Sequence, residues 1–350
     1  MSFADLGGWP AVLGALSRRI DLPAASAAAA MTEILEGRAT SSQIAAFCIA
    51  LRMKGETVEE MDGLLGAMFD HVLPVVVEGA DSLVDTCGTG GDRSCTINAS
   101  TLAALVVAGA GARVCKHGNR AASSRCGSAD LLEALGVAAD IGPAGVVACI
   151  QEAGMGFCFA PRFHPALRHA GPTRRELGVP TVFNFLGPLA NPARLRRQSL
   201  GVSDPKMAVK MAGVLQSRGA ERAFVVYGHD GLDEITTTTT STVIEVRDGE
   251  SRTYDIDPTD LGLPLADPVD LLGGDASTNA GLARRVLEGK GGAQRDFVLL
   301  NAAAGIVVAG LADDLAAGLE AAAASIDDGR AGAVLERMVK VSQEHATPAG

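Results

Sequence analysis

The sequence predicts an α/β protein with a small N-terminal all-helical domain and a larger α/β domain, whose central sheet is mixed but mostly parallel. Two observations support this. The first seventy residues show helical periodicity and no strand pattern, whereas from Val84 onward short β-branched or apolar runs alternate with helical segments. Such alternation is typical of a parallel sheet covered by helices. We expect residues 1–72, joined by parts of 162–190, to form the helical domain and residues 73–350 the α/β domain.

The helical domain is predicted from its start and stop signals. An alanine-rich helix over 24–35 ends at Gly37, a second helix is capped by Ser41-Ser42, and a third opens at 57–60 and runs toward Phe69. In the α/β domain the strand and helix patterns are shorter and alternate. The expected strands are 83–86, 113–116, 156–159, 198–202 and 223–227, and the expected helices include 128–135, 144–153 and 206–217. Residues 242–246 and 251–256, joined by Asp248-Gly249, predict an antiparallel hairpin.

Composition excludes several classes of protein. The 350 residues carry a net charge of −11 and only 4% aromatics, which disfavours a nucleic-acid partner that needs basic surfaces and stacking platforms. The seven scattered cysteines form no C-x-x-C pair, so we expect small buried residues rather than disulfides or zinc ligands. The opening MSFADLGGWP lacks the basic start of a secretory signal, and no apolar run is long enough to span a bilayer. We therefore expect a cytoplasmic protein without a membrane partner.

A glycine-rich turn follows the first predicted strand. Residues 88–92 read GTGGD, small polar residues follow, and an apolar helix is expected over 102–110. Glycine lets the backbone approach a ligand closely, and the first N–H groups of a helix lack intrahelical partners, so this pattern favours a phosphate site. An ordinary glycine turn is the alternative. Asp92 suits ribose hydroxyls or a magnesium shell.

A second segment, 116–130, reads KHGNRAASSRCGSAD and follows the second predicted strand. Lys116 offers a point charge, Arg120 and Arg125 offer planar donors for anions, and the serines complete a cradle. A solvated basic loop is the alternative. His117 is interpreted as a structural residue.

Residues 161–175 carry four arginines, Arg162, Arg168, Arg174 and Arg175, and no acid. In an acidic protein this is a local positive field, which suits an anionic group such as a carboxylate. The alternative is that acids from elsewhere in the fold offset the cluster. The sequence does not tell which arginine faces a ligand.

Two adjacent carboxylates, Asp233 and Glu234, follow the strand predicted at 223–227. Ligands of open α/β sheets gather at the carboxyl ends of the strands. Magnesium takes one or two protein carboxylates together with substrate phosphates and water, which this pair would provide. A solvated turn is the alternative. Together the four segments indicate a phosphorylated or pyrophosphorylated sugar, a second anionic substrate and magnesium.

The segments DTCGTGGD…TINAST, KHGNRAASSRCGSADLLEALG, FAPRFHPALRHAGPTRRELGVPTVFNFLGPLANP and VYGHDGLDE, in this order and spacing, resemble the anthranilate phosphoribosyltransferase family over nearly the whole chain. The resemblance implies a pentosyltransferase of tryptophan biosynthesis with a nucleoside phosphorylase-like fold. It implies transfer of the phosphoribosyl group from phosphoribosyl pyrophosphate (PRPP) to the amine of anthranilate. Magnesium, two ions per monomer, and a homodimer are also implied.

The resemblance assigns roles by position. The PRPP residues would be Gly88, Gly91, Asp92, Thr96, Asn98, Ala99, Ser100, Thr101, Lys116, His117, Gly118, Asn119, Arg120, Ala121, Ala122, Ser123, Ser124 and Ser128. The anthranilate residues would be Gly88, Asn119 and Arg174, and the magnesium ligands Ser100, Asp233 and Glu234. Lys116 and magnesium would stabilise the transition state.

Two positions depart from the family pattern. Arg93 stands where glycine is usual, and the threonine run 236–240 replaces a pattern that more often holds glycine and proline. Two alternatives remain at this stage. A pyrimidine nucleoside phosphorylase would have little use for the Asp233–Glu234 pair, and a non-catalytic nucleic-acid-binding relative would need a basic surface.

Overall fold

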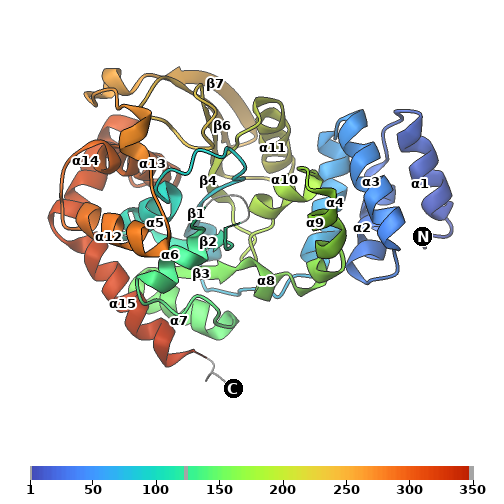
Figure 1. The fold of residues 1–350 in the computed structure, drawn as a ribbon, viewed down its shortest axis with the longest axis horizontal. Coiled ribbons are helices and arrows are strands. Elements are labelled where there is room, and N and C mark those ends of the chain that lie inside the picture. Colours follow the sequence, from blue (N-terminus) through green and yellow to red (C-terminus); the bar gives the residue numbers. More distant parts are fainter. Residues whose placement is uncertain (1, 122–124, 347–350) are drawn as a thin grey trace.

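A seven-stranded sheet runs through the computed structural model, which describes residues 2–121 and 125–346 (Figure 1). The strand order is β3-β2-β1-β4-β5-β6-β7. The strands are β1 Leu83–Gly88, β2 Arg113–Gly118, β3 Met155–Phe159, β4 Arg197–Gly201, β5 Arg222–Gly228, β6 Ser241–Arg247 and β7 Glu250–Ile256. The first five are parallel, and β6 and β7 continue the sheet as an antiparallel hairpin. This confirms the predicted mixed, mostly parallel sheet.

Both faces of the sheet are buried, and β5 shows how the sequence achieves this. Side chains of a strand alternate between faces. Ala223 and Val225 join an apolar cluster that continues into the N-terminal helices, whereas Phe224 and Val226 join the cluster beneath the C-terminal helices. A strand buried on both faces needs a continuous apolar run, which is the pattern that residues 223–226 show.

Helices cover both faces of this sheet (Figure 1). They are α5 Ala99–Gly109, α6 Ser128–Ala134, α7 Pro143–Ala153, α11 Pro205–Ser217, α12 Ala276–Leu287, α13 Ala293–Val308, α14 Leu315–Asp327 and α15 Arg330–Glu344. Short 3-10 turns occupy Ala80–Ser82, Pro165–His169, Pro258–Leu261 and Pro268–Leu271. Helix α5 is buried nearly all round between the sheet and α13, α14 and α15, which explains why its sequence is apolar on every side.

A helical unit lies at one end of the molecule (Figure 1). It contains α1 Gly8–Ser17, α2 Ala24–Leu35, α3 Ser41–Lys54 and α4 Val58–Asp70. The chain returns to it as α8 Ala160–Phe163, α9 Gly171–Leu177 and α10 Val182–Leu189, and α9 and α10 pack against α3 and α4. Capping boxes start α3 at Thr40 with Gln43 and α4 at Thr57 with Glu60, so the cap of α3 lies one residue before the predicted Ser41-Ser42.

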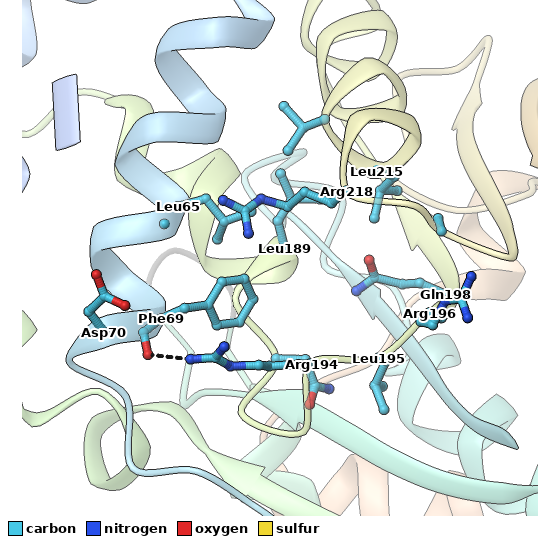
Figure 2. A pocket seen from close by; sticks show the side chains of 14 residues that line it. Leu65, Phe69, Asp70, Leu189, Arg194, Leu195, Arg196, Gln198, Leu215 and Arg218 are labelled. Atoms are coloured by element: carbon cyan, nitrogen blue, oxygen red, sulfur yellow. Dashed lines mark hydrogen bonds between the residues drawn. The ribbon is translucent and has the colours of Figure 1, made fainter. Parts of the chain in front are cut away.

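A cavity of about 250 Å³ opens at the junction between α4, the chain before β4 and the end of α11 (Figure 2). Phe69 of α4 lies between two arginines there. The guanidinium carbons of Arg194 and Arg218 are 5.1 and 5.3 Å from its ring centroid. Arg194 also donates a hydrogen bond of 2.9 Å to the Phe69 carbonyl, drawn dashed in Figure 2. These contacts join the helical unit to the α/β part.

No disulfide joins any of the seven cysteines. In the described parts of the chain, no helix combines the length and the apolar character needed to cross a membrane.

We predict that Gly63→Ala destabilises the protein by about 1–3 kcal/mol, because a Cβ on Gly63 would lie 2.2 Å from the carbonyl oxygen of Ala24, a backbone atom of α2 that cannot turn aside. Gly66 is the matched control on the same helix. Its nearest neighbour is the tip of Arg218 at 3.4 Å, so Gly66→Ala should be neutral or stabilising. Urea unfolding midpoints measure both. Equal midpoints for the two variants would contradict the tight α2–α4 contact.

Candidate active site

The carboxyl ends of the parallel strands bring three of the predicted segments together. The glycine loop follows β1, the 118–127 loop follows β2, and residues 229–240 follow β5. Parallel register places these strand ends at one edge of the sheet. Helix α5 begins at the same edge, with Asn98 as its N-cap. The amino end of α5 therefore faces the loops that carry the acids.

Asp233 and Glu234 lie against the glycine loop and the first turn of α5. The Asp233 carboxylate accepts a hydrogen bond of 2.7 Å from the Gly90 amide, and Glu234 accepts one of 3.3 Å from the Ser100 amide. The positive end of a helix favours such a carboxylate. The predicted residues Asp233, Glu234 and Ser100 thus meet in one place, together with Gly90, the neighbour of the predicted Gly91.

Two glycines are required by the close approach of the acid loop. A Cβ on Gly88 would lie 2.2 Å from a carboxylate oxygen of Asp233, and one on Gly201 would lie 1.6 Å from the Asp233 backbone oxygen. Gly88 was predicted to approach substrate. In the structure its missing side chain also makes room for Asp233 itself.

Burial and mutual repulsion perturb both acids. Burial, followed by the charge of Asp92, raises the pKa of Asp233 to about 6. Burial, followed by the charges of Asp233 and Asp92, raises the pKa of Glu234 well above its usual range. The Oε2 atom of Glu234 is buried and has no hydrogen-bond partner in the described chain. Concentrated negative charge with an unused oxygen fits a cation held jointly with a substrate's phosphates.

The described residues contain no group of three or more histidine, cysteine, aspartate or glutamate side chains arranged to hold a metal by themselves.

Lys116 lies beneath this acid pair. Its side chain is 1% exposed, and its ammonium donates to the Thr86 carbonyl and, at 3.4 Å, to the Ser100 hydroxyl. Its positive charge partly offsets the raised pKa of Glu234 and of the buried Asp85. Lys116 is therefore part of the wall of the site, next to the predicted metal ligands.

The glycine loop is held in an unusual backbone conformation. Arg93 and Cys95 have φ values of 59° and 55°, in the left-handed region that side chains rarely adopt. Asp92 accepts a hydrogen bond of 2.6 Å from the Ser94 hydroxyl, and the hydroxyls of Ser94 and Thr96 are 3.4 Å apart. The left-handed geometry explains physically why glycine would suit position 93.

The loop after β2 is tied to the start of α5. Thr101 donates to the Ser128 hydroxyl at 3.0 Å, and the Asn98 amide donates to the Cys126 carbonyl at 2.9 Å. Gly118 has no room for a side chain, because a Cβ would lie 2.8 Å from Phe157 and 3.1 Å from Ser128.

Three of the predicted PRPP residues, Ala122, Ser123 and Ser124, lie outside the described residues. Of the remaining residues in this loop, Arg120 is already engaged. It pairs with Asp130 at 3.0 Å and with Glu133 at 2.6 Å, and the Ala121 amide donates to Asp130 at 2.9 Å. Asn119 is exposed and accepts a bond of 2.7 Å from the Arg120 amide.

Arg174 stands apart from the other arginines of its cluster. It lies on α9, its guanidinium carbon is 5.0 Å from the Phe183 ring centroid, and burial lowers its pKa. In the described chain Arg162 is paired with Asp140, whereas Arg168, Arg174 and Arg175 make no ion pair, and of these three only Arg174 is half-buried. A half-buried guanidinium without an acid is suited to an anionic ligand.

Sequence reasoning missed three residues that hold the site. Asn301 of α13 brackets Ile235, accepting from its amide at 3.0 Å and donating to its carbonyl at 2.9 Å. Asn279 of α12 donates to Asn98 at 2.8 Å. Asp230 binds the threonines that follow the acid pair. Asn301 and Asn279 stand alone in the sequence and belong to no motif. Asp230 and the threonine run 236–240 could be seen in the sequence, but nothing there indicated that they bind each other.

Comparison with known proteins identifies the family of the two parts of the chain. The α/β domain of a glycosyl transferase family matches residues 80–332, and the helical bundle domain of a glycosyl transferase family matches residues 10–72. The chain is therefore a glycosyltransferase.

Relatives narrow the family. The anthranilate phosphoribosyltransferase of Rhodococcus opacus is 54% identical over 95% of this chain and 93% of its own length, and that of Acidothermus cellulolyticus is 54% identical over 97% of each. The crystal structure of the Thermus thermophilus enzyme has a TM-score of 0.90 at 41% identity, over 95% of this chain and 99% of that one. The Saccharomyces cerevisiae enzyme in complex with PRPP and Mg has a TM-score of 0.87 at 26% identity, over 96% and 98%. The chain belongs to the anthranilate phosphoribosyltransferase family.

Two buried histidines predict acid sensitivity. The rings of His117 and His164 are 5.0 Å apart, and burial lowers the pKa of His164 to about 4 and that of His117 well below its usual value. Each histidine stays neutral in the folded protein but protonates in the unfolded chain near pH 6.5. Their contribution to stability is therefore complete above pH 6.5 and is lost as the pH falls toward 4.

We expect each of these histidines to lower the free energy of unfolding by at most about 1.4 kcal/mol per pH unit as the pH falls below 6.5, whereas the raised pKa values of Asp233 and Glu234 act in the opposite direction. His164→Gln should flatten this dependence in urea titrations at several pH values. The exposed His345, replaced in His345→Gln, is the control and should leave the slope unchanged. A slope that His164→Gln does not alter would refute the assignment.

Proposed function

We propose that the protein transfers the 5-phosphoribosyl group from PRPP to the amine of anthranilate, giving N-(5-phosphoribosyl)anthranilate and pyrophosphate in tryptophan biosynthesis. One observation carries the proposal. The Asp233–Glu234 pair meets the start of α5 and Lys116 at the carboxyl edge of the sheet, in a chain 54% identical to anthranilate phosphoribosyltransferases. The acids suit a metal shared with a pyrophosphate, and the helix start suits the phosphate itself.

In this proposal the loops at that edge bind the donor. The PRPP residues are Gly88, Gly91, Asp92, Thr96, Asn98 to Thr101, Lys116 to Ser124 and Ser128. Two observations support this. Hydrogen bonds join the loop after β2 to the start of α5, and the yeast relative has been solved in complex with PRPP and Mg. Arg120 is occupied by Asp130 and Glu133, so its contribution to PRPP requires that these ion pairs be exchanged.

Magnesium fits the described residues, because Glu234 offers an unused buried oxygen beside Asp233. When bound, magnesium would screen the charge of the pyrophosphate as it leaves. We assign Ser100, Asp233 and Glu234 to hold it, with two ions per chain as the proposed number. Two ions would balance the clustered acids more completely than one.

The chain's own groups are proposed to position the reactants rather than to supply a strong base. Amides at the start of α5 and the buried ammonium of Lys116 stabilise negative charge as the bond from the anomeric carbon to pyrophosphate breaks. The ribose ring develops oxocarbenium character, and the amine of anthranilate attacks the anomeric carbon. Exclusion of water by the two parts of the molecule protects the donor from hydrolysis.

Anthranilate is proposed to lie between Gly88, Asn119 and Arg174. The guanidinium of Arg174, which has no acid partner in the described chain, would bind the carboxylate. The nucleoside phosphorylase alternative is not favoured, because the relatives at about 53% identity are anthranilate phosphoribosyltransferases.

We also propose a boundary near residue 72 between a helical domain, which includes parts of 162–190, and the α/β domain. The packing of α9 and α10 on α3 and α4 supports it. A homodimer is proposed because the helical unit exposes the apolar side chains of Met53 (71%) and Ile20 (50%), which a second copy would cover. A cytoplasmic location stays a prediction.

The decisive measurement is the release of pyrophosphate from PRPP. We expect release only with anthranilate and magnesium together, and Arg174→Gln should raise the KM for anthranilate by about 10-fold or more, because a charge-assisted contact to the carboxylate is lost. Arg168→Gln, which changes an exposed arginine of the same cluster, is the control. Absence of pyrophosphate release with anthranilate, whether or not magnesium is present, would refute the proposed function.

A further inference from the structure

The acid pair lies in a loop, and some interaction must hold that loop in a single conformation. Asp233 and Glu234 lie in the segment 229–240, which connects the end of β5 to the start of β6. A loop of this length has many conformations, yet both carboxylates must point to one place. The threonine run 236–240 lies directly after them, and no substrate role accounts for it.

One carboxylate gathers this run. Asp230 accepts hydrogen bonds from the hydroxyls of Thr236 at 2.7 Å and Thr238 at 2.5 Å, and from the Leu232 amide at 3.2 Å. The Thr236 hydroxyl in turn accepts from the Thr238 amide at 3.0 Å. Hydrogen bonds to a charged acceptor are stronger than neutral ones. We call Asp230, Thr236 and Thr238 the Asp230 cluster.

The Asp230 cluster closes the loop around the acid pair. Asp230 precedes Asp233 by three residues, and Thr236 follows Glu234 by two, so their contact joins the chain on both sides of the pair. Gly228 allows this approach, because a Cβ there would lie 2.3 Å from an Asp230 carboxylate oxygen. The pair is thus held in a short closed segment.

Other contacts fix that segment to the core. Thr236 donates its amide to the Ser241 hydroxyl at 2.9 Å, at the start of β6. Asn301 holds Ile235 through two hydrogen bonds. Backbone hydrogen bonds from Gly228 to Leu232 and from His229 to Thr240 close the base of the loop, and the Asp230 cluster adds side-chain contacts across it.

We infer that the Asp230 cluster positions Asp233 and Glu234 for magnesium, and this inference rests on the proposed function. Its members act through the acid pair rather than on the substrate. Groups that orient metal ligands in this way typically change metal affinity 10- to 100-fold when they are removed.

The test uses Mn²⁺ as a spectroscopic probe, with pyrophosphate and without anthranilate, so that no turnover occurs. Electron paramagnetic resonance of the full chain gives the apparent Kd for Mn²⁺. We expect Asp230→Asn and Thr236→Val to raise it about 10- to 100-fold. Thr236→Ser keeps the hydroxyl and should restore tight binding.

Thr239→Val is the matched control, because the Thr239 hydroxyl makes no hydrogen bond to the described residues, and its Kd should equal that of the wild type. Thr238→Val removes one donor only and is the milder variant should Asp230→Asn fail to fold. Normal Mn²⁺ affinity in Thr236→Val and Thr238→Val, or a loss of thermal stability without a change in Kd, would overturn the inference.

Failure of the metal site on which the proposed function depends would give a different result. If Asp233→Asn binds Mn²⁺ with pyrophosphate as tightly as the wild type, the metal site lies elsewhere, and the role of the Asp230 cluster falls with it. If Asp233→Asn weakens binding and Thr236→Val does not, the metal site stands and only the positioning role is wrong.

Discussion

Repulsion between acids is the constraint on which this site depends. Burial and the charge of Asp92 raise the pKa of Asp233, and burial and the charges of Asp233 and Asp92 raise the pKa of Glu234. The fold compensates with amides at Gly90 and Ser100 and with the buried ammonium of Lys116. The compensating groups come from the loop after β1, from α5 and from β2, and they meet the acids of the loop after β5. The parallel sheet brings these groups to one edge, so the arrangement of the strands determines which charges meet in the site.

Much of the fold could be predicted because its signals are local. Strands buried on both faces read as apolar runs, and Asp248-Gly249 between two β-prone segments indicates a hairpin. The adjacency of Asp233 and Glu234 and the glycine turn at residue 88 were also visible. The bonds of Asn301 to Ile235 and of Asn279 to Asn98 join residues far apart in sequence. No periodicity or turn signal encodes such pairs, so they required the structure. The ion pairs of Arg120 were missed for a related reason, since a loop arginine can face ligand or protein.

The junction between the helical unit and the sheet combines an apolar core, which continues from α4 into α11 and β5, with polar contacts beside it. Phe69 lies between Arg194 and Arg218, and Arg52 pairs with Asp204 at 2.9 Å across the same junction. Contacts of this kind are modest in energy and half solvated. A cavity of about 250 Å³ lies beside them. The helical unit is therefore fixed to the sheet by apolar packing and by polar contacts together.

The left-handed backbone of Arg93 has a consequence for the stability and the motion of the glycine loop. An arginine at φ 59° costs about 1–2 kcal/mol relative to a right-handed conformation, whereas glycine would adopt it without penalty. The same side chain narrows the conformations open to the unfolded segment, by an amount worth up to about 1 kcal/mol. The two effects oppose each other in overall stability, and the strain is the larger. The side chain also affects kinetics, because a residue with fewer conformations leaves the loop fewer ways to rearrange. Position 93 therefore links the stability of the protein to the rate at which the glycine loop moves.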